Sequence, residues 1–514
     1  MSSGFSPAEY LKLIRESDVY GVAIESPLDE APLLSSRLEA SVFLKREDLQ
    51  PVHSFKLRGA HAAMARLDPE VLAKGVVAAS AGNHAQGVAL SAQKMGCRAV
   101  IVVPATTPEV KRNAIENLGA ELVTHGDTYH DAYQRAREIE QEESLTFIHP
   151  YDDPFVIAGQ GTIGVELDSQ LPPGPSIVFA AVGGGGLVSG LCLAIKQLRP
   201  GSKVFGVEPE DSPAMHDSIR AGERVVLEKP GLFADGVAVR QVGEETFRIC
   251  QELLDGVIVV TNDAICAAVK DVYEEKRAIL EPSGALPVAG LKQWAETGGR
   301  KDLPLVAVTG GANVSFDRLR HISERADLGE KTEAIFAVRI PERPGSFRQL
   351  CSVLGKRSVT EFNYRMDCQD EAVVFVGVRT RTEDESEGIL HSLRSGLYPA
   401  YDLTHDELAK THVRHMIGGM ASVPNEKIYH FLFPERPGAL GEFLDKLGGR
   451  WNISLFHYRN HGSDRGRVLA GFQIPNSTQA EFNSFLTDLG YEFTEESLNP
   501  SVGLFLSRPL GRGQ

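Results

Sequence analysis

Four consecutive glycines between two apolar segments restrict the possible folds of this chain more than any other feature. Residues 176–182 form a short apolar run typical of a buried parallel strand, and residues 187–198 have the pattern of a helix. A strand, a glycine loop and a helix in this order point backbone N–H groups and the positive end of a helix toward an anion. A flexible linker is the alternative, but linkers do not usually separate a buried strand from an apolar helix. The glycines lack the Gly-Lys-Ser/Thr of a Walker loop and the Gly-x-Gly-x-x-Gly spacing of a dinucleotide site.

One lysine with apolar neighbours is the second candidate for chemistry: Lys56 lies between Phe55 and Leu57. Lysine forms Schiff bases with carbonyl compounds and with pyridoxal phosphate, and burial helps it to lose the proton that would prevent this. The alternative is an ordinary surface lysine at the start of a helix that Ser54 caps. Together, Lys56 and the glycine loop indicate an enzyme whose lysine binds a phosphorylated aldehyde cofactor and whose loop holds the phosphate.

Short apolar runs alternate with helical stretches up to about residue 325. Strands are predicted at residues 75–79, 99–104, 120–124 and 203–208, and helices at residues 108–118 and 131–142. This alternation predicts two parallel sheets, each covered by helices on both faces. A cofactor site would lie between the sheets, at the carboxyl ends of their strands.

A polar boundary at residues 323–332 precedes a duplication. The segment 340–347 (IPERPGSF) recurs at 433–440 (FPERPGAL), 361–365 recurs at 455–459, and 376–378 recurs at 470–472. One inserted residue keeps the two copies in register. Each copy reads as strand, Pro-Gly loop, helix, strand, strand, helix and strand, which is the ferredoxin-like split β-α-β arrangement.

Size, charge and cysteine content exclude several classes of protein. At 514 residues the chain needs more than one core, and a net charge of −16 argues against nucleic acid and anionic membranes as partners. No apolar run reaches the roughly 18 residues of a membrane span, and the N-terminal residues are not expected to act as a signal peptide. The cysteines are scattered and form no Cys-x-x-Cys pair, which predicts a reduced, cytoplasmic protein without disulfides or zinc; they are Cys97, Cys192, Cys250, Cys266, Cys351 and Cys368.

Three further motifs point to a family: residues 80–87 (SAGNHAQG), 281–285 (EPSGA) and 310–313 (GGAN). With residues 54–60 (SFKLRGA) and the glycine loop, they resemble biosynthetic threonine dehydratase (threonine deaminase), a fold-type II pyridoxal-phosphate enzyme. The repeated Pro-Glu-Arg-Pro-Gly loop resembles that of ACT domains, small modules that bind amino acids. The resemblance implies a tryptophan synthase β-like α/β catalytic domain of two subdomains at residues 1–327. Two ferredoxin-like, ACT-type α+β domains would follow at residues 333–410 and 427–507.

The resemblance also implies a role for each motif residue. Lys56 would be the catalytic residue, which binds the cofactor as a Schiff base and later moves the Cα proton, and Asn83 would hydrogen-bond the cofactor's 3′-oxygen. Without the other motifs, Asn83 could equally be a helix cap. The loop that receives the substrate carboxylate would be Ser80, Ala81, Gly82, Asn83 and His84. The cofactor phosphate would be held by Gly183, Gly184, Gly185, Gly186 and Leu187.

The sequence departs from the family pattern near the end of the catalytic domain. The family commonly has Ser-Gly-Ala-Asn there, with the serine hydroxyl facing the pyridine nitrogen of the cofactor, and alignment places Gly310 at the serine position. Either Thr309 or a water molecule replaces this hydroxyl, or the nitrogen has no such partner. Cofactor binding is still expected, because the phosphate and the Schiff base supply most of the hold.

Two absences separate the chain from related enzymes. Serine racemases of this fold have a serine before the Gly-Asn pair as the acid/base on the second face of the substrate, and here that residue is Ala81. Elimination can proceed from the lysine face alone. The related metal site pairs a glutamate with an aspartate. Here Glu208 is present but Ala214 stands at the second position, so no tightly bound divalent metal is expected.

The predicted function is the elimination of water and ammonia from L-threonine to give 2-oxobutanoate, the first committed step of isoleucine biosynthesis, with L-serine as a second substrate. The resemblance further implies a homotetramer, feedback inhibition by isoleucine through the C-terminal repeats, and opposition to it by valine. Three alternatives stay open: the repeats serve assembly alone, the enzyme is another fold-type II lyase, or the chain is an amino-acid sensor with an inert catalytic half.

Overall fold

The structure is a computed structural model that describes residues 4–499, with Val502 and Leu506, except for residues 106, 127, 232, 331, 367–370, 381, 397, 407–408, 410–413, 415–420, 435–438 and 460–464. Cys368 and the Glu-Arg-Pro-Gly of the second repeated loop therefore lie outside the described residues. The chain divides into two compact units, Met1–Gly329 and Glu330–Gln514. None of the described helices is both long and apolar enough to cross a membrane.

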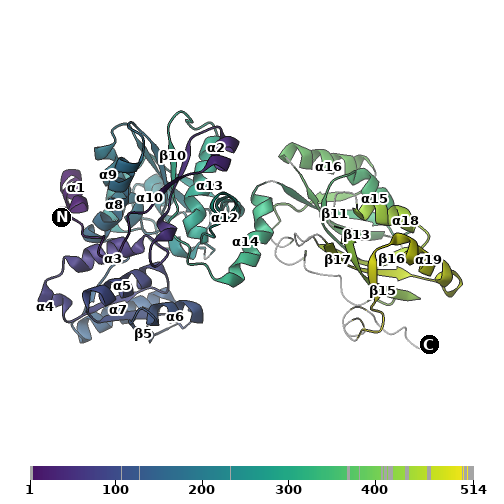
Figure 1. Ribbon diagram of the computed structural model, residues 1–514, viewed down its shortest axis with the longest axis horizontal. Coiled ribbons are helices and arrows are strands. Elements are labelled where there is room, and N and C mark those ends of the chain that lie inside the picture. The colour runs from purple at the N-terminus through teal and green to yellow at the C-terminus, as the bar shows by residue number, and fades with distance from the viewer. Residues whose placement is uncertain are drawn as a thin grey trace. The chain divides into compact units, whose positions relative to one another are not determined.

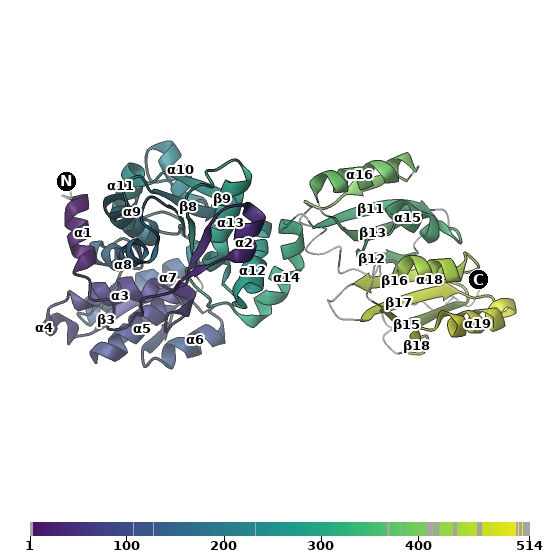
Figure 2. The same cartoon turned by 45° about the horizontal axis from the view of Figure 1, so that its top comes forward.

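The larger sheet of the first unit has the strand order β1-β2-β10-β7-β8-β9 and is parallel except at β1. Its strands are β1 (Leu28–Glu30), β2 (Val42–Lys45), β7 (Ile177–Ala181), β8 (Lys203–Pro209), β9 (Gly256–Val260) and β10 (Leu305–Val308). Figures 1 and 2 show the helices that surround it. These are α1 (Pro7–Arg15), α2 (Pro32–Leu38), α8 (Pro154–Gln170), α9 (Gly186–Leu198), α10 (Ala214–Ala221), α11 (Glu244–Leu253), α12 (Asn262–Lys276), α13 (Pro282–Glu296) and α14 (Phe316–Gly329). The central strands β7 and β10 are buried along their whole length, as expected when helices cover both faces of a parallel sheet.

The smaller sheet of this unit is parallel throughout, in the order β5-β4-β3-β6. Its strands are β3 (Val76–Ala79), β4 (Ala99–Val103), β5 (Glu121–Thr124) and β6 (Thr146–Phe147). Its helices are α3 (Lys56–Ala65), α4 (Pro69–Leu72), α5 (Asn83–Met95), α6 (Glu109–Glu116) and α7 (Tyr129–Glu142), and the 3-10 turns of the unit are η1 (Glu47–Leu49) and η2 (Asp235–Val237). The prediction of two parallel sheets is confirmed, and the predicted strands and helices have ends within two residues of the observed ones.

The second unit is built on one antiparallel sheet in the order β14-β11-β13-β12-β16-β17-β15-β18. The first copy contributes β11 (Glu333–Pro341), α15 (Ser346–Leu354), β12 (Val359–Arg365), β13 (Glu371–Arg379), α16 (Glu383–Ser395) and β14 (Ala400–Asp402). The second contributes β15 (Glu426–Pro434), α18 (Ala439–Leu447), β16 (Asn452–Arg459), β17 (Arg465–Gln473), η4 (Asn476–Thr478), α19 (Gln479–Leu489) and β18 (Glu492–Glu495). The predicted β-α-β-β-α-β order is thus confirmed in both copies.

The two copies are joined through their strands. Strand β12 pairs with β16, with Asn363 opposite His457, so the copies form a continuous sheet. Figure 2 shows α15, α16, α18 and α19 along one face of it. A single apolar core, which includes Phe336 and Leu350 from the first copy and Phe443 and Phe482 from the second, runs between the sheet and these helices. The predicted division into separate domains ending at residues 410 and 507 stays a prediction.

Candidate functional site

Lys56 lies at the start of α3, and its amine donates a hydrogen bond to the carbonyl oxygen of Pro150 at 3.0 Å. Burial lowers the pKa of Lys56 to about 8, although the nearby Glu281 carboxyl acts in the opposite direction. Ser54 does not cap this helix, because Phe55 holds the N-cap position and no side chain makes a capping bond there. Lys56 is half-buried and hydrogen-bonded, which disfavours an ordinary solvated surface lysine, and its lowered pKa lets the amine lose its proton more readily.

The loop of residues 80–84 joins the carboxyl end of β3 to the first turn of α5. This turn offers unpaired backbone N–H groups to an anion such as a carboxylate. His84 is buried behind the loop, where Nε2 lies 2.9 Å from the carbonyl oxygen of Ile148. Burial lowers the pKa of His84 to about 3, and the nearby Lys56 contributes to this, so the imidazole is neutral. His84 thus supports the loop and brings no charge to it.

Asn83 is held at both ends of its amide. Its Nδ2 donates to Oε1 of Glu281 at 2.6 Å, and its Oδ1 accepts from Nδ2 of Asn313 at 2.7 Å. Ser283 Oγ donates to the same Glu281 oxygen at 2.7 Å. Glu281 is buried, and burial raises the pKa of its carboxyl. The EPSGA and GGAN motifs therefore fix the orientation of Asn83.

The glycine loop connects β7 to α9, and Gly185 has a positive φ of 99°. Neighbouring residues fill the space that a side chain would need: a Cβ on Gly184 would lie 2.2 Å from Cγ of Tyr151. Thr246 in α11 donates from Oγ1 to the carbonyl oxygen of Gly184 at 2.6 Å, which holds the loop in place. None of the backbone N–H groups of residues 183–187 has an acceptor among the described residues. A row of unpaired donors at a helix N-terminus fits a phosphate group.

Two consecutive residues connect the lysine to the glycine loop. Pro150 accepts the hydrogen bond from Lys56, and the ring of Tyr151 packs on Gly184 while its backbone approaches Gly186. Asp152, the next residue, accepts from the backbone N–H groups at the start of α11, the helix that carries Thr246. The segment between the two sheets thus places the amine, the phosphate loop and its support in one region.

The structure tests whether Thr309 can take the place of the missing serine. The Thr309 hydroxyl is buried, 2.8 Å from the carbonyl oxygen of Lys45 and 2.9 Å from Oδ1 of Asp48. It is therefore already used within the protein. At Gly310 itself an added Cβ would lie 3.3 Å from the ring of Phe55, so a serine would fit only if this ring shifts slightly.

A buried cluster of ion pairs lies next to the lysine. Arg58 pairs with Glu47 at 2.8 Å and with Glu166 at 2.5 Å, and Lys45 also pairs with Glu166 at 2.5 Å. All four side chains are at most 2 % exposed. Because two cations balance two carboxylates, the cluster carries no net charge, and it ties α3 to β2 and α8. Removing one partner would leave a buried charge without compensation.

Glu208 is used as a structural group. Its two carboxyl oxygens accept from the backbone N–H groups of Met215 and His216, both at 2.8 Å, at the start of α10. Burial raises the pKa of Glu208 to about 8. Within the described part of the chain, no group of three or more His, Cys, Asp or Glu side chains is arranged to hold a metal ion. The expectation of no tightly bound metal stays a prediction.

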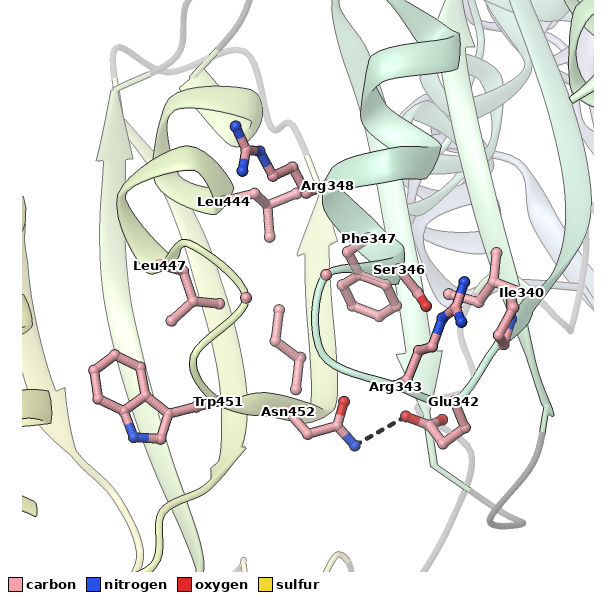
Figure 3. Close-up of a pocket in the computed structure, with 14 residues that line it drawn as sticks. Ile340, Glu342, Arg343, Ser346, Phe347, Arg348, Leu444, Leu447, Trp451 and Asn452 are labelled. Atoms are coloured by element: carbon pink, nitrogen blue, oxygen red, sulfur yellow. Dashed lines mark hydrogen bonds between the residues drawn. The ribbon is translucent and has the colours of Figure 1, made fainter. Parts of the chain in front are cut away.

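A second candidate site lies in the other unit, where the first Pro-Gly loop meets the second copy. Figure 3 shows this pocket, which spans about 350 Å³ including its open mouth. Its apolar wall includes Phe347, Leu447 and Trp451. Its polar rim includes Glu342, which accepts from Nδ2 of Asn452 at 3.1 Å, and Arg343. A pocket with both signs of charge beside an apolar wall suits an amino acid with a hydrophobic side chain.

The sequence did not assign Pro150, Tyr151, Thr246 or Asn313 to the site. Pro150 acts through its backbone and Tyr151 mainly through packing, whereas Thr246 acts through its hydroxyl; none of these contacts leaves a motif in the sequence. Glu281 was quoted within a motif but was given no role. The sequence feature that could have identified it is a single charged residue before the apolar run GALPVAGL. A glutamate in such a setting is difficult to bury unless other side chains pair with it.

Comparison with known proteins shows which families have this architecture. Residues 20–310 match the pyridoxal-phosphate dependent enzyme family, and residues 324–413 and 418–506 match the C-terminal regulatory domain of threonine dehydratase. The chain is 53 % identical to the biosynthetic L-threonine dehydratase of Burkholderia multivorans, over 97 % of this chain and 99 % of that protein. It is 50 % identical to the Escherichia coli enzyme, over 97 % of each. Processed threonine deaminase isoform 2 from Solanum lycopersicum superposes with a TM-score of 0.62 at 49 % identity, over 63 % of this chain and 90 % of that one.

Fold and site together define a fold-type II pyridoxal-phosphate enzyme with a C-terminal regulatory part. Within this class the chain belongs to the family of biosynthetic threonine dehydratases.

Proposed function

We propose that the site around Lys56 eliminates water and ammonia from L-threonine to give 2-oxobutanoate. The protein is a pyridoxal-phosphate-dependent threonine ammonia-lyase of isoleucine biosynthesis under allosteric control. The main support for these residue roles is that Lys56 and the glycine loop both contact the neighbouring residues Pro150 and Tyr151. These two residues join an amine of lowered pKa to a loop of unpaired N–H donors.

The residues divide the work of the reaction between them. When bound, pyridoxal phosphate supplies an electron sink for the charge released at the substrate Cα. The N–H groups of residues 183–187 would hold its phosphate, and Asn83, oriented by Glu281 and Asn313, would hydrogen-bond its 3′-oxygen. The first turn of α5 receives the substrate carboxylate. Lys56 Nζ accepts the Cα proton, and its lowered pKa makes the neutral, proton-accepting amine easier to form than for an ordinary lysine.

The proton chemistry favours elimination over racemisation. Ala81 has no exchangeable proton, so the residues assigned here place an acid/base only on the lysine face. L-Serine differs from L-threonine by one methyl group, which is worth about 1–3 kcal/mol in discrimination. We therefore expect serine to react more slowly and to give pyruvate.

The test is an assay of 2-oxobutanoate from purified enzyme, pyridoxal phosphate and L-threonine. We expect steady product formation by the wild-type enzyme and none by Lys56→Ala. A few per cent of residual activity in Lys56→Ala would contradict the role of Lys56. If the wild-type enzyme formed no product, Gly310→Ser would be the next variant, because it supplies the missing hydroxyl and requires only a small shift of the Phe55 ring.

We propose that isoleucine is the inhibitor, that valine opposes it, and that the pocket between the two copies binds them. The support is its apolar wall and the charged rim of Glu342 and Arg343. Trp451 lines this pocket, and Trp294 in the other unit is the only other tryptophan of the chain. Isoleucine should therefore change the fluorescence of Trp294→Phe and leave that of Trp451→Phe unchanged. The reverse result would place the effector elsewhere.

We also propose a homotetramer in the cytoplasm, as the family resemblance suggests. Light scattering of the holoenzyme should give about four times the chain mass of 55.9 kDa. A mass of one or two chains would contradict the tetramer.

A further inference from the structure

Asp235 connects three separate parts of the catalytic unit. Its Oδ2 pairs with Nζ of Lys111 at 2.7 Å, and its Oδ1 with Nη1 of Arg318 at 3.0 Å. Lys111 belongs to α6 of the smaller sheet, Asp235 opens η2 beside the larger sheet, and Arg318 lies in the first turn of α14. Burial alone would raise the pKa of Asp235, but the two cations hold it below its ordinary value. In both Figure 1 and Figure 2, α6 lies near α14.

This junction borders the active site. The residue after Asp235, Gly236, faces Ser283, since an added Cβ would lie 2.4 Å from Ser283 Oγ. The next residue, Val237, faces the phosphate loop, because a Cβ on Gly183 would lie 3.0 Å from Val237 Cα. Ser283 donates to Glu281, which orients Asn83. A movement of η2 would therefore be felt both at the phosphate loop and at Asn83.

Helix α14 is tied to its neighbour α12 by two ion pairs and by a shared apolar core. Lys270 of α12 pairs with Asp327 of α14 at 2.8 Å, and Asp263 pairs with Arg325. Ile322 is buried in the same core. The helix ends at Gly329, and only residues 330–332 separate it from β11 of the regulatory unit. Along the chain, α14 is therefore the last helix of the catalytic unit before the regulatory unit begins.

We propose that the Lys111–Asp235–Arg318 junction carries regulation from α14 to the smaller subdomain and so sets the affinity for threonine. When α14 shifts, the ion pair between Arg318 and Asp235 lengthens or shortens. Asp235 then moves, and Lys111 moves with it together with α6. The inference rests on the proposed inhibition by isoleucine. Coupling between two sites needs an element whose state both sites bias, and here that element is the junction. The side chains of these ion pairs are each about one-quarter to one-third exposed. Such pairs contribute little to the free energy of folding, so stability alone does not account for the junction.

The test compares two arginines on the same helix in the full-length holoenzyme. Arg318→Met breaks the junction, whereas Arg320→Met removes only an exposed pair with Glu324 on the surface of α14. We expect isoleucine to bind both variants in calorimetry, but the concentration for half-inhibition to rise at least about fivefold in Arg318→Met alone. Hydrogen exchange of the peptide covering Glu109–Glu116 should also rise in Arg318→Met and in Asp235→Asn, and not in Arg320→Met.

Each outcome decides a separate question. Equal inhibition and equal exchange in Arg318→Met and Arg320→Met would overturn the junction as the route. A wild-type enzyme that isoleucine does not inhibit would overturn the proposed effector. The exchange of α6 would then still decide whether Asp235 links α14 to the smaller subdomain, because this measurement needs no effector.

Discussion

The lowered pKa of Lys56 has a consequence for loading of the apoprotein. The amine is mostly protonated below pH 8 and mostly neutral above it, whereas an ordinary lysine changes state near 10.4. Only the neutral amine attacks the cofactor aldehyde. The rate of pyridoxal phosphate uptake should therefore rise with pH up to about 8 and level off above it. Absorbance of the bound cofactor after rapid mixing measures this rate. A rate that still climbs tenfold between pH 9 and 10 would contradict the burial argument.

We predict that Glu281 contributes to the free energy of unfolding, because two side-chain donors hydrogen-bond one of its oxygens. Glu281→Ala removes the acceptor of the buried Ser283 hydroxyl and of the half-buried Asn83 amide, and a buried donor left unpaired costs about 1–3 kcal/mol. We expect the unfolding free energy of the apoprotein to fall by about 2–5 kcal/mol. Glu281→Gln keeps an acceptor oxygen and should lose less than about 1 kcal/mol. Denaturant unfolding measures both variants, and equal losses would show that charge and not hydrogen bonding matters.

The residues with the most specialised roles could be found from the sequence, whereas the partners that hold them in place could not. Lys56 and the glycines stand out because few other residue types can do their work. Glu281 and Asn83 are almost 200 positions apart, and no local pattern says that their side chains meet. The same holds for Arg58, whose partners Glu47 and Glu166 lie on other elements. Such choices depend on tertiary packing, which a single sequence does not display.

The glycine loop is the element whose shape can be tested most directly. Gly184→Ala would push a methyl group into the ring of Tyr151, so the loop must shift and its N–H groups lose their alignment. We expect pyridoxal phosphate to bind at least about tenfold more weakly, which is about 1.4 kcal/mol. Tyr151→Ala should make room and recover part of the affinity in the double variant, a coupling that a double-mutant cycle measures. Gly388→Ala, at an exposed helical glycine with open space, is the control and should leave cofactor affinity unchanged. Additive effects at Gly184 and Tyr151 would contradict this packing argument.

The elements that sequence reasoning located are those with strong periodicity. Strands β3, β4, β7 and β8 are nearly uniform apolar runs because they are buried on both faces. Which strands pair with one another is more difficult to predict from the sequence. The duplication predicted two β-α-β-β-α-β modules, but not that β12 would pair with β16 and merge them into one sheet. Alternation along a strand fixes which face is buried and leaves the partner strand open.

At the scale of the whole molecule, duplication creates a pocket that one copy alone could not form. The first copy contributes Glu342 from its Pro-Gly loop and Phe347 from α15, whereas the second copy contributes Leu447 and Trp451. The catalytic unit, in contrast, has its own cores on both sheets and contains every residue assigned to the reaction. The residues assigned to the reaction and the pocket proposed for the effector therefore lie in different units of the chain.

This separation predicts the behaviour of a chain cut after Gly329. The truncated enzyme should bind pyridoxal phosphate and deaminate threonine, because Lys56, Asn83 and the glycine loop are all retained. It should be insensitive to isoleucine, since the pocket has been removed. Product formation at fixed threonine, measured over increasing isoleucine, gives both results, with the full-length enzyme as the control. Inhibition that persists after truncation would move the effector site into the catalytic unit. Retained folding by circular dichroism with loss of all turnover would show instead that the regulatory unit supports the active conformation even without effector.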